Sequence, residues 1–508
     1  MFETAEVGQR VSKAIYKTEI PRLRVDLINA QYDLRDADFT VILVLAGDDR
    51  MSCNAVLHHL HDVMDARYMA TYALGSPSES ERERPRFWRY WRALSPQGQI
   101  GVFLGAWPIV AIQDRILGKS DDVEYDQRLV HIRNFEQALV DDGALLLKFW
   151  LHLPKKQLKK RLKIAKKRSE QAWQLTEREG LFYDLYDECI PQAERLIRET
   201  STGQAPWFII ESTDERYRQL VIDRIILQHI TTRLGCAPTP LASSALRDQT
   251  DRQYGNTTIL DTVDLTKTVT RPEYRNKRSQ YQGELSRLTR QARTAGVTSI
   301  LLFEGWDAAG KGGVIRRITA ALDPELYHVI PIAAPTEEER ARHYLWRFWR
   351  YLPRAGRVLI FDRSWYGRVL VERVEALTPE AAWQRAYSEI NDFEQQLCDH
   401  GISVLKFWLH IDPDEQWRRF QARQETPYKK YKLTEEDYRN RDKWPDYERA
   451  VHDMVERTST TYAPWHLVPS NDKRWARIYV LETFCRALEQ RFQLSHDKLK
   501  SDRSSKRS

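Results

Sequence analysis

The sequence predicts an α/β protein of two tandem domains, each a parallel sheet flanked by helices. A chain of 508 residues is too long for one hydrophobic core, so we expect two or more domains. A shift of 258 positions aligns two copies of one module of about 220 residues, because Gly47 then meets Gly305 (305 − 47 = 258) and many tryptophans coincide. Within each copy, short apolar segments alternate with helical ones, as in a parallel sheet covered on both faces.

Each copy opens with a charged helical segment that leads into a buried strand ending at glycine. These strands are expected at 41–45 and 299–303, followed by helices at about 55–65 and 313–322. Further strands are expected at 99–104 and 357–362, at 144–149 and 403–408, and after Pro206 and Pro464. Trp346 and Trp349 lie on a helical stretch and are interpreted as core residues.

The repeat also predicts the domain boundaries. Residues 1–234 form the first domain and 271–494 the second. The Pro- and Ser-containing segment 235–270 is typical of a linker. Residues 495–508 are rich in Ser, Lys, Arg and Asp and are expected to form a disordered basic tail.

Composition excludes several classes of protein. No apolar run approaches the roughly 18 residues that span a bilayer, so no membrane partner is expected. The five cysteines lie far apart, which argues against a disulfide framework and a structural zinc site. The first residues lack the layout of a signal peptide, and a cytoplasmic location is expected. The net charge of +7 is modest, but Lys and Arg cluster, so the clusters are either solvated helix faces or contacts for a polyanion.

The second copy carries the pattern of a phosphate-binding loop between a strand and a helix. It reads Gly305-Trp-Asp-Ala-Ala-Gly-Lys311, in which glycines let backbone N–H groups turn toward phosphate at a helix N-terminus. Lys311 would reach phosphate oxygens as a mobile charge. The alternative is a plain tight turn. The candidate phosphate ligands in this loop are Gly305, Ala308, Ala309, Gly310, Lys311, Gly312 and Gly313.

Carboxylates near this loop indicate a magnesium site. Gly312 stands where the usual loop has a Ser or Thr that ligates the metal, so Asp307 is the candidate replacement. Asp362 ends an apolar strand, in the layout of a Walker B aspartate. Mg²⁺ prefers a few hard oxygen ligands plus water and phosphate, with Mn²⁺ as an alternative ion. Glu372 is the third candidate ligand.

Two arginines follow the strand-end aspartate. Arg363 and Arg368 would neutralise phosphoryl charge during an in-line transfer, where positioning and electrostatics do most of the work. A surface salt bridge is the alternative for each. The proposed catalytic set is Asp307, Lys311, Asp362, Arg363 and Arg368.

The segment 423–447 has the composition of a lid. Basic and aromatic residues alternate along it, which suits a flap that closes over phosphates and excludes water. An exposed basic helix is the alternative. The candidate polyphosphate contacts in this segment are Arg423, Lys429, Lys432 and Arg439.

The first copy has lost these charged groups while keeping the residues of the fold. Asp49 still matches Asp307, but its neighbours differ, so we expect a degenerate, catalytically silent domain that either stabilises its partner or extends a polyphosphate groove. The replaced pairs are Lys311 and Cys53, Gly310 and Ser52, Asp362 and Leu104, Arg363 and Gly105, and Arg368 and Val110.

Three motifs together resemble the second polyphosphate kinase family. They are the loop 305–313, Phe361-Asp-Arg-Ser-Trp-Tyr366, and Ala463-Pro-Trp465 followed by Ser470-Asn-Asp-Lys473. The resemblance covers both copies. It implies a P-loop kinase-like fold with a lid, and magnesium-dependent phosphoryl transfer between inorganic polyphosphate and a nucleotide. It assigns the chemistry to the loop lysine and aspartate and to the aspartate–arginine pair after the second strand.

Members of that family with two fused domains phosphorylate AMP to ADP, so the resemblance favours AMP as acceptor and a silent first domain. Three alternatives remain. They are a polyphosphate-dependent kinase that converts ADP to ATP, an ATP-dependent nucleoside monophosphate kinase, and a non-enzymatic scaffold that binds polyphosphate or nucleic acid. Nucleic acid is not an expected partner of the enzyme, and a homo-oligomer is left open.

Overall fold

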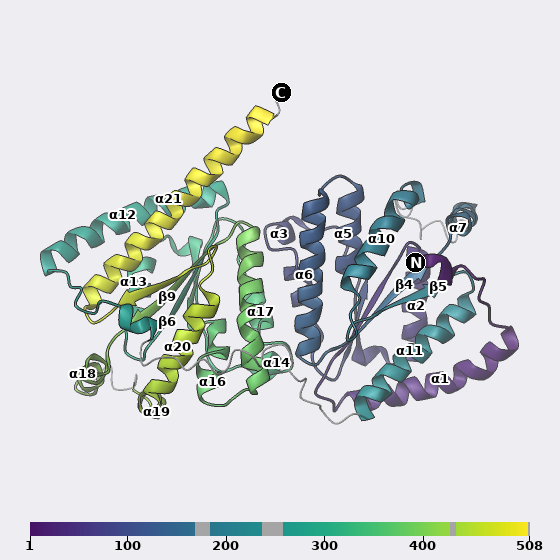
Figure 1. Cartoon of the computed structure of the whole chain (residues 1–508), viewed down its shortest axis with the longest axis horizontal. Helices are drawn as coiled ribbons and strands as arrows, with labels where there is room; N and C mark the ends of the chain where they lie inside the picture. The colour runs from purple at the N-terminus through teal and green to yellow at the C-terminus, as the bar shows by residue number, and fades with distance from the viewer. Residues whose placement is uncertain (168–182, 236–257, 427–432, 506–508) are drawn as a thin grey trace. The chain divides into compact units, whose positions relative to one another are not determined.

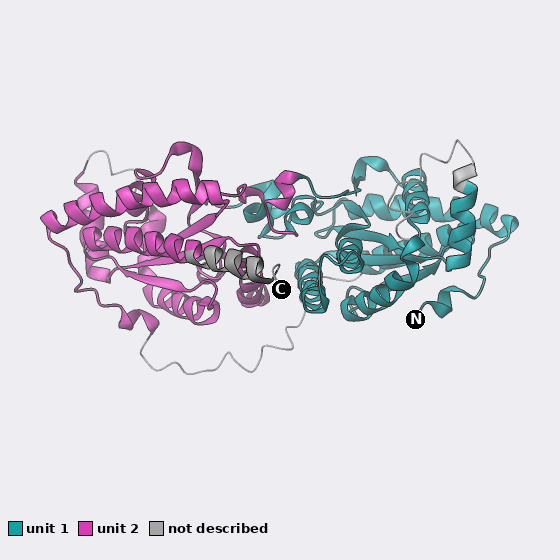
Figure 2. Ribbon diagram, turned by 90° about the horizontal axis from the view of Figure 1, so that it is seen from above, with its two compact units in different colours: residues 1–78, 87–241, 335–349 teal, residues 79–86, 242–334, 350–508 magenta. Residues whose placement is uncertain are grey.

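The computed structural model describes residues 1–167, 183–235, 258–426 and 433–505 (Figure 1). The chain forms two compact units, shown in different colours in Figure 2. Unit 1 comprises residues 1–78, 87–241 and 335–349, and unit 2 comprises residues 79–86, 242–334 and 350–508. Each unit therefore holds one copy of the repeat, with two exceptions. Residues 79–86 come from the first copy but belong to unit 2, and residues 335–349 come from the second copy but belong to unit 1.

Each unit contains a five-stranded sheet in which every pair of neighbours runs parallel. In unit 1 the order is β2-β3-β1-β4-β5, with β1 Val41–Gly47, β2 Met69–Tyr72, β3 Ile100–Leu104, β4 Leu145–His152 and β5 Trp207–Glu211. In unit 2 the order is β7-β8-β6-β9-β10, with β6 Ser299–Gly305, β7 Tyr327–Pro331, β8 Val358–Asp362, β9 Ser403–His410 and β10 Trp465–Pro469.

Helices cover both faces of each sheet (Figure 1). In unit 2, α12, α13 and α21 contact one another, while α17 packs against β9 and α20. The elements of unit 1 are η1 Phe2–Ala5, α1 Lys13–Leu34, α2 Arg50–Val63, η2 Ala66–Tyr68, α4 Trp88–Arg92, α5 Ala106–Ile116, α6 Asp122–Asp141, α7 Lys155–Lys167, α10 Tyr186–Thr200, α11 Glu215–Gly235 and α14 Glu337–Arg340. Those of unit 2 are α3 Glu79–Arg82, η3 Ile259–Thr262, α12 Arg271–Ala295, α13 Lys311–Thr319, η4 Pro324–Leu326, η5 Trp365–Arg368, α16 Val371–Val374, α17 Glu380–Asp399, α18 Pro413–Gln424, α19 Glu435–Asp442, α20 Trp444–Thr458 and α21 Lys473–Ser505. Helix α15 spans Trp346–Tyr351.

The expected α/β class is confirmed, and each predicted strand is present. Trp346 and Trp349 lie in α15 and are buried, with 4% and 1% of their surface exposed, as expected for core residues. No helix among the described ranges is long and apolar enough to cross a bilayer.

Three elements differ from the sequence predictions. The strands β2 and β7 were not predicted, because each is an edge strand with one buried residue (Met69 and Ile330) and so lacks an apolar run. Helix α21 continues to Ser505, into the segment expected to be a disordered tail, since no Gly or Pro interrupts it. Most of the expected linker, residues 236–257, lies outside the described residues.

The strand register fixes where the candidate site forms. The central strand β6 pairs with β8 on one side and β9 on the other, which places Phe303 opposite Asp362 and Gly305 opposite Leu409. Because parallel strands end at the same edge of a sheet, the loop after β6 and the turn after β8 lie side by side.

Candidate functional site

The loop after β6 has a backbone that requires glycine at its first position. Gly305 has φ of 144°, and a Cβ atom there would lie 2.5 Å from the carbonyl oxygen of Leu409. Gly310 caps α13 with φ of 114°, in the left-handed region that favours glycine. The chain therefore passes directly from the sheet to a helix N-terminus, whose free N–H groups favour an anion.

Arg419 on α18 binds the backbone of this loop through buried hydrogen bonds. Its side chain is 3% exposed and its Nη1 atom donates to the carbonyls of Ala308 (2.9 Å) and Ala309 (2.8 Å). Nη2 donates to the carbonyls of Ser470 (2.5 Å) and Asn471 (3.0 Å). Sequence reasoning missed Arg419, although its counterpart Arg161 is retained in the first copy.

Lys311 begins α13 and turns back over the loop. Its Nζ atom donates to the carbonyl of Gly305 at 2.6 Å. The side chain is half-buried and also lines a cavity. The ammonium group thus donates to a backbone oxygen, and a phosphate oxygen could replace that oxygen as the acceptor.

Asp307 lies between an arginine and residues of the predicted lid segment. Its Oδ1 atom is 3.7 Å from Nη2 of Arg363, and Oδ2 accepts a hydrogen bond of 2.9 Å from Nδ2 of Asn440 on α19. Tyr447 on α20 in turn donates to Oδ1 of Asn440 at 3.2 Å. The loop aspartate is therefore oriented by groups on three separate elements.

Arg363 stands just past the end of β8 with φ of 65°. Burial alone would lower the pKa of its guanidinium, but the nearby carboxylates, Asp307 first, outweigh burial and raise that pKa. Its side chain remains 47% exposed, so the cation is both paired and accessible.

A buried carboxylate that sequence reasoning missed lies directly before the loop. Glu304 is 6% exposed and accepts a hydrogen bond of 2.8 Å from Oγ of Ser364. Burial raises the pKa of its carboxyl, while the Lys311 ammonium opposes that shift. A polar residue at the end of an apolar strand, replaced by Ala46 in the first copy, was the available signal.

Aromatic residues close one side of the loop. The ring of Trp306 stacks on Trp444 with 3.5 Å between centroids and 9° between planes. Its Nε1 atom donates to Nδ1 of His410 at 3.0 Å. Burial lowers the pKa of His410 to about 4, which is consistent with a neutral imidazole that accepts this bond.

A cavity of about 640 Å³ brings most of these groups together. Four of its lining residues were predicted from sequence: Gly305, Asp307, Lys311 and Arg363. Glu304, Asn440 and Tyr447 join them. Asp362, the last residue of β8, directly precedes the lining residue Arg363.

The other predicted lid and arginine residues that the structure describes are not in the lining of this cavity. Arg368 pairs with Glu372 at 2.9 Å and donates to Oγ1 of Thr378 at 2.6 Å. Arg439 pairs with Glu375 at 3.2 Å. Arg423 is in the last turn of α18. Lys429 and Lys432 lie outside the described residues.

The carboxylates near the loop suit a divalent cation whose other ligands are phosphate oxygens and water. Within the described ranges, no three His, Cys, Asp or Glu side chains gather as a metal site. Asp307 and Asp362 nevertheless offer hard oxygens at neighbouring strand ends, and Mg²⁺ is commonly held by one or two carboxylates together with phosphates and water. Glu372 is engaged by Arg368.

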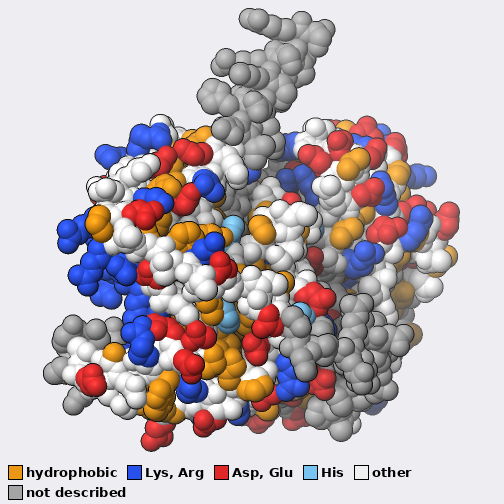
Figure 3. All heavy atoms as spheres, turned by 60° about the vertical axis from the view of Figure 1, so that its left-hand side comes forward, with side chains coloured by type: hydrophobic (Ala, Val, Ile, Leu, Met, Phe, Trp, Pro, Cys, Tyr) orange, Lys and Arg blue, Asp and Glu red, His pale blue; other side chains and the backbone are white. Residues whose placement is uncertain are grey.

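Basic side chains also gather beside the N-terminus of α13. Figure 3 shows Lys and Arg side chains concentrated on one side of a face of the molecule. Burial and then Arg317 lower the pKa of Arg477, and partial desolvation followed by Arg419 lowers the pKa of Lys473 to about 8. At the matching positions the first copy has His59, Gln219 and Glu215 in place of Arg317, Arg477 and Lys473.

In the first copy, arginines of unit 1 itself bind side chains of the matching loop. Arg161 pairs with Asp49 and donates to Oγ of Ser52 at 2.5 Å. Arg218 donates to the same Oγ at 3.0 Å. Cys53 replaces the lysine, and burial raises the pKa of its thiol far above the usual range. Arg161 and Arg218 are therefore bound to side chains of the loop in unit 1.

Comparison with known proteins agrees with the geometry. The family model for polyphosphate kinase 2 (PPK2) matches residues 10–235 and again 268–495. A polyphosphate:AMP phosphotransferase of Pseudomonas aeruginosa is 46% identical over 498 residues, which cover 96% of this chain and 99% of that protein. The polyphosphate:AMP phosphotransferase of Acinetobacter johnsonii is 38% identical, covering 95% and 98%.

A solved structure is similar over the same length. The crystal structure of a candidate polyphosphate kinase 2 from Pseudomonas aeruginosa superposes with a TM-score of 0.87 at 44% identity, covering 97% of this chain and all (100%) of that one. The resemblance inferred from the three motifs is thus confirmed. Two matches of one family model, one in each copy, show that the chain belongs to the polyphosphate kinase 2 family.

Proposed function

We propose that this chain transfers the terminal phosphoryl group of inorganic polyphosphate to AMP and releases ADP, with Mg²⁺ as the metal ion and Mn²⁺ able to replace it. One observation carries the proposal: unit 2 gathers Asp307, Lys311 and Arg363 around one cavity, with Asp362 at the adjoining strand end. The full-length relatives named polyphosphate:AMP phosphotransferases support AMP as the acceptor.

In this proposal Lys311 and the loop N–H groups bind the phosphates that meet at the reacting bond. Lys311 exchanges the carbonyl of Gly305 for a phosphate oxygen, and Arg363 neutralises charge that develops on the transferred group. A phosphate oxygen of AMP is already a nucleophile at neutral pH, so the transfer needs no general base. The oxygen attacks the terminal phosphorus, and the bond to the bridging polyphosphate oxygen breaks.

Asp307 and Asp362 would hold Mg²⁺, which neutralises phosphate charge and aligns the oxygens when it is bound. Asn440 fixes Oδ2 of Asp307, so the carboxylate is positioned before substrate arrives. Arg316, Arg317, Lys473 and Arg477 offer a basic path for the rest of the polyphosphate chain, extended by Arg423 and Arg439. Trp306 and Trp444 exclude water from one side of the loop.

The direct test offers the purified chain each donor with each acceptor. We expect ADP from AMP plus polyphosphate, and little product from AMP plus ATP or from ADP plus polyphosphate. Turnover with ATP alone as donor would indicate an ordinary nucleoside monophosphate kinase, and ATP formation as the main reaction would make ADP the acceptor. Absence of turnover with every donor would leave only a binding protein.

A matched pair of variants assigns the reaction to unit 2. Lys311→Met keeps the bulk of the side chain but removes the ammonium, so we expect a loss of at least about 1,000-fold in kcat. Cys53→Ser changes the equivalent residue of unit 1 and should leave kcat unchanged. Equal losses in the two variants, or near-normal activity of Lys311→Met, would contradict the assignment.

A further inference from the structure

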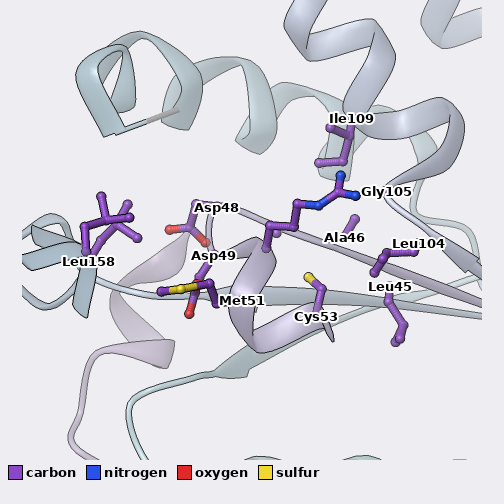
Figure 4. Close-up of a pocket in the computed structure, with 13 residues that line it drawn as sticks. Leu45, Ala46, Asp48, Asp49, Met51, Cys53, Leu104, Gly105, Ile109 and Leu158 are labelled. Carbon is purple, nitrogen blue, oxygen red and sulfur yellow. The ribbon is translucent and has the colours of Figure 1, made fainter. Parts of the chain in front are cut away.

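Unit 1 retains a cavity at the place where unit 2 has its candidate active site. It encloses about 530 Å³, part of it open to solvent, between the loop after β1, the end of β3 and helix α7. Figure 4 shows Cys53 and Leu104 on one side of this space and Leu158 on the other. The cavity therefore persists although the phosphate ligands are gone.

At five positions the walls of this cavity have changed from charged or polar to apolar, whereas Asp48 and Arg50 replace Trp306 and Ala308. Ala46 replaces Glu304, Cys53 replaces Lys311 and Gly105 replaces Arg363. Leu104 and Leu158 replace Asp362 and Gln416. A copy that served for packing alone would be more stable with larger apolar side chains here, because burying apolar surface contributes about 25 cal/mol per Å². An apolar ligand would recover that free energy.

Anions are disfavoured at this site. Asp48 and Asp49 both line the cavity beside one cation, Arg50, and each carboxylate already has a basic partner outside the lining. Arg161 pairs with Asp49, and Nδ1 of His152 lies 3.1 Å from Asp48. A phosphate would meet two carboxylates and displace existing ion pairs. A neutral ring, in contrast, needs only the apolar walls, and a ring N–H could donate to a carboxylate edge.

We propose that unit 1 binds an uncharged aromatic molecule of one or two rings, bearing an N–H donor, in the cavity lined by Cys53, Leu104 and Leu158. An apolar pocket with a few polar groups at one edge is the usual form of a small-molecule site. This site is independent of phosphoryl transfer and remains whether or not AMP is the acceptor in unit 2.

Met51 provides a local probe, because it lines the cavity and is one of only five methionines in the chain. We would label the methionine methyl groups with ¹³C in the full chain and follow their NMR shifts. The titrants are indole and adenosine as uncharged rings, and AMP and tripolyphosphate as charged counterparts. We expect a saturable shift of the Met51 resonance with indole or adenosine and none with the two phosphates.

A variant that fills the cavity provides the control. Cys53→Leu should abolish the Met51 shift while the resonances of Met64 and Met69 remain native and transferase activity is unchanged. If that variant fails to fold, Leu158→Phe fills the same space from α7. The proposal is overturned if neither ring shifts Met51, if the phosphates shift it equally, or if a folded filled variant still responds.

Discussion

Replacing Arg419 with methionine tests whether one buried guanidinium shapes the phosphate loop. Methionine keeps most of the apolar stem but removes four hydrogen bonds to the carbonyls of Ala308, Ala309, Ser470 and Asn471. It also leaves the carboxylate of Glu415, which is 10% exposed, without the partner that lies 2.5 Å from it. The expected effect therefore combines lost stability with a misplaced loop.

The magnitude follows from the burial of these groups. Removing one partner of a buried ion pair costs about 3–5 kcal/mol, since the other charge remains desolvated. A change of 1 kcal/mol shifts the Tm of a domain of 150–250 residues by about 2–4 °C, so the Tm of unit 2 should fall by roughly 6–20 °C. Restoring neutrality with Glu415→Gln in the same chain should recover part of that loss.

Two measurements separate the loop effect from general destabilisation. Calorimetry gives the Tm, and hydrogen exchange of the peptide 305–313 reports the loop at temperatures where unit 2 is still folded. We expect faster exchange in that peptide and a drop of at least about tenfold in kcat, because misplacement of the phosphates by about 1 Å is costly. Arg161→Met is the matched control in unit 1, where the side chain is 28% exposed.

The control should destabilise unit 1 by roughly 1–3 kcal/mol through its lost hydrogen bonds and leave kcat unchanged. Our account of the loop would be refuted if Arg419→Met kept both native exchange in 305–313 and wild-type kcat. It would also be refuted if Arg161→Met lowered kcat to the same extent as Arg419→Met.

Two further predictions concern other buried charges. Burial raises the pKa of Glu304, so the folded chain holds this proton to higher pH than the unfolded chain; the stabilisation is present below about pH 4.3 and is lost as pH rises through the raised pKa. Glu304→Gln, which can still accept from Ser364, should therefore gain stability relative to wild type as pH rises above about 4.3, seen as a growing difference in Tm, and a constant difference would contradict this. Lys406 is fully buried (0% exposed) and donates to Glu394 at 2.7 Å, so Lys406→Met should cost about 3–5 kcal/mol in unit 2 and lower activity on mild heating. Lys148→Met should destabilise unit 1 by a similar amount without lowering kcat, and heat-sensitive activity in that variant alone would contradict the assignment of the reaction to unit 2.

The parts of the fold that sequence could predict are those whose residues carry a local pattern. The central strands are continuous apolar runs because both of their faces are covered, and Gly305 marks the strand end because its backbone admits no side chain. The edge strands β2 and β7 were missed since one face and one edge of each meet solvent. The candidate phosphate loop could be predicted for the same reason as the central strands, because the residues that shape its backbone and would bind phosphate are adjacent in the sequence.

The parts of the site that could not be predicted depend on contacts between distant residues. Arg419 lies 111 positions from Ala308, and Asn440 lies 133 positions from Asp307. Nothing near either residue in the sequence indicates which backbone oxygen or carboxylate it binds. The ion pair between Arg368 and Glu372 is also seen only in the folded structure, although their i, i+4 spacing on a helical segment permits it.

The two copies show how one substitution in the loop changes the chemistry behind it. His410 and His152 occupy matched positions at the ends of β9 and β4. In unit 2 the neighbour is Trp306, whose N–H needs an acceptor, and burial lowers the pKa of His410 so that it stays neutral. In unit 1 the same position is Asp48, and although burial opposes it, the carboxylates of Asp48 and Glu6 raise the pKa of His152. Unit 1 therefore has a histidine–aspartate pair, with 3.1 Å between Nδ1 of His152 and the Asp48 carboxylate, where unit 2 has a histidine that accepts a hydrogen bond from a tryptophan. Restoring a lysine at position 53 would return one cation to a loop that still carries Asp48 and lacks a strand-end carboxylate, so we expect Cys53→Lys alone to give unit 1 no transferase activity.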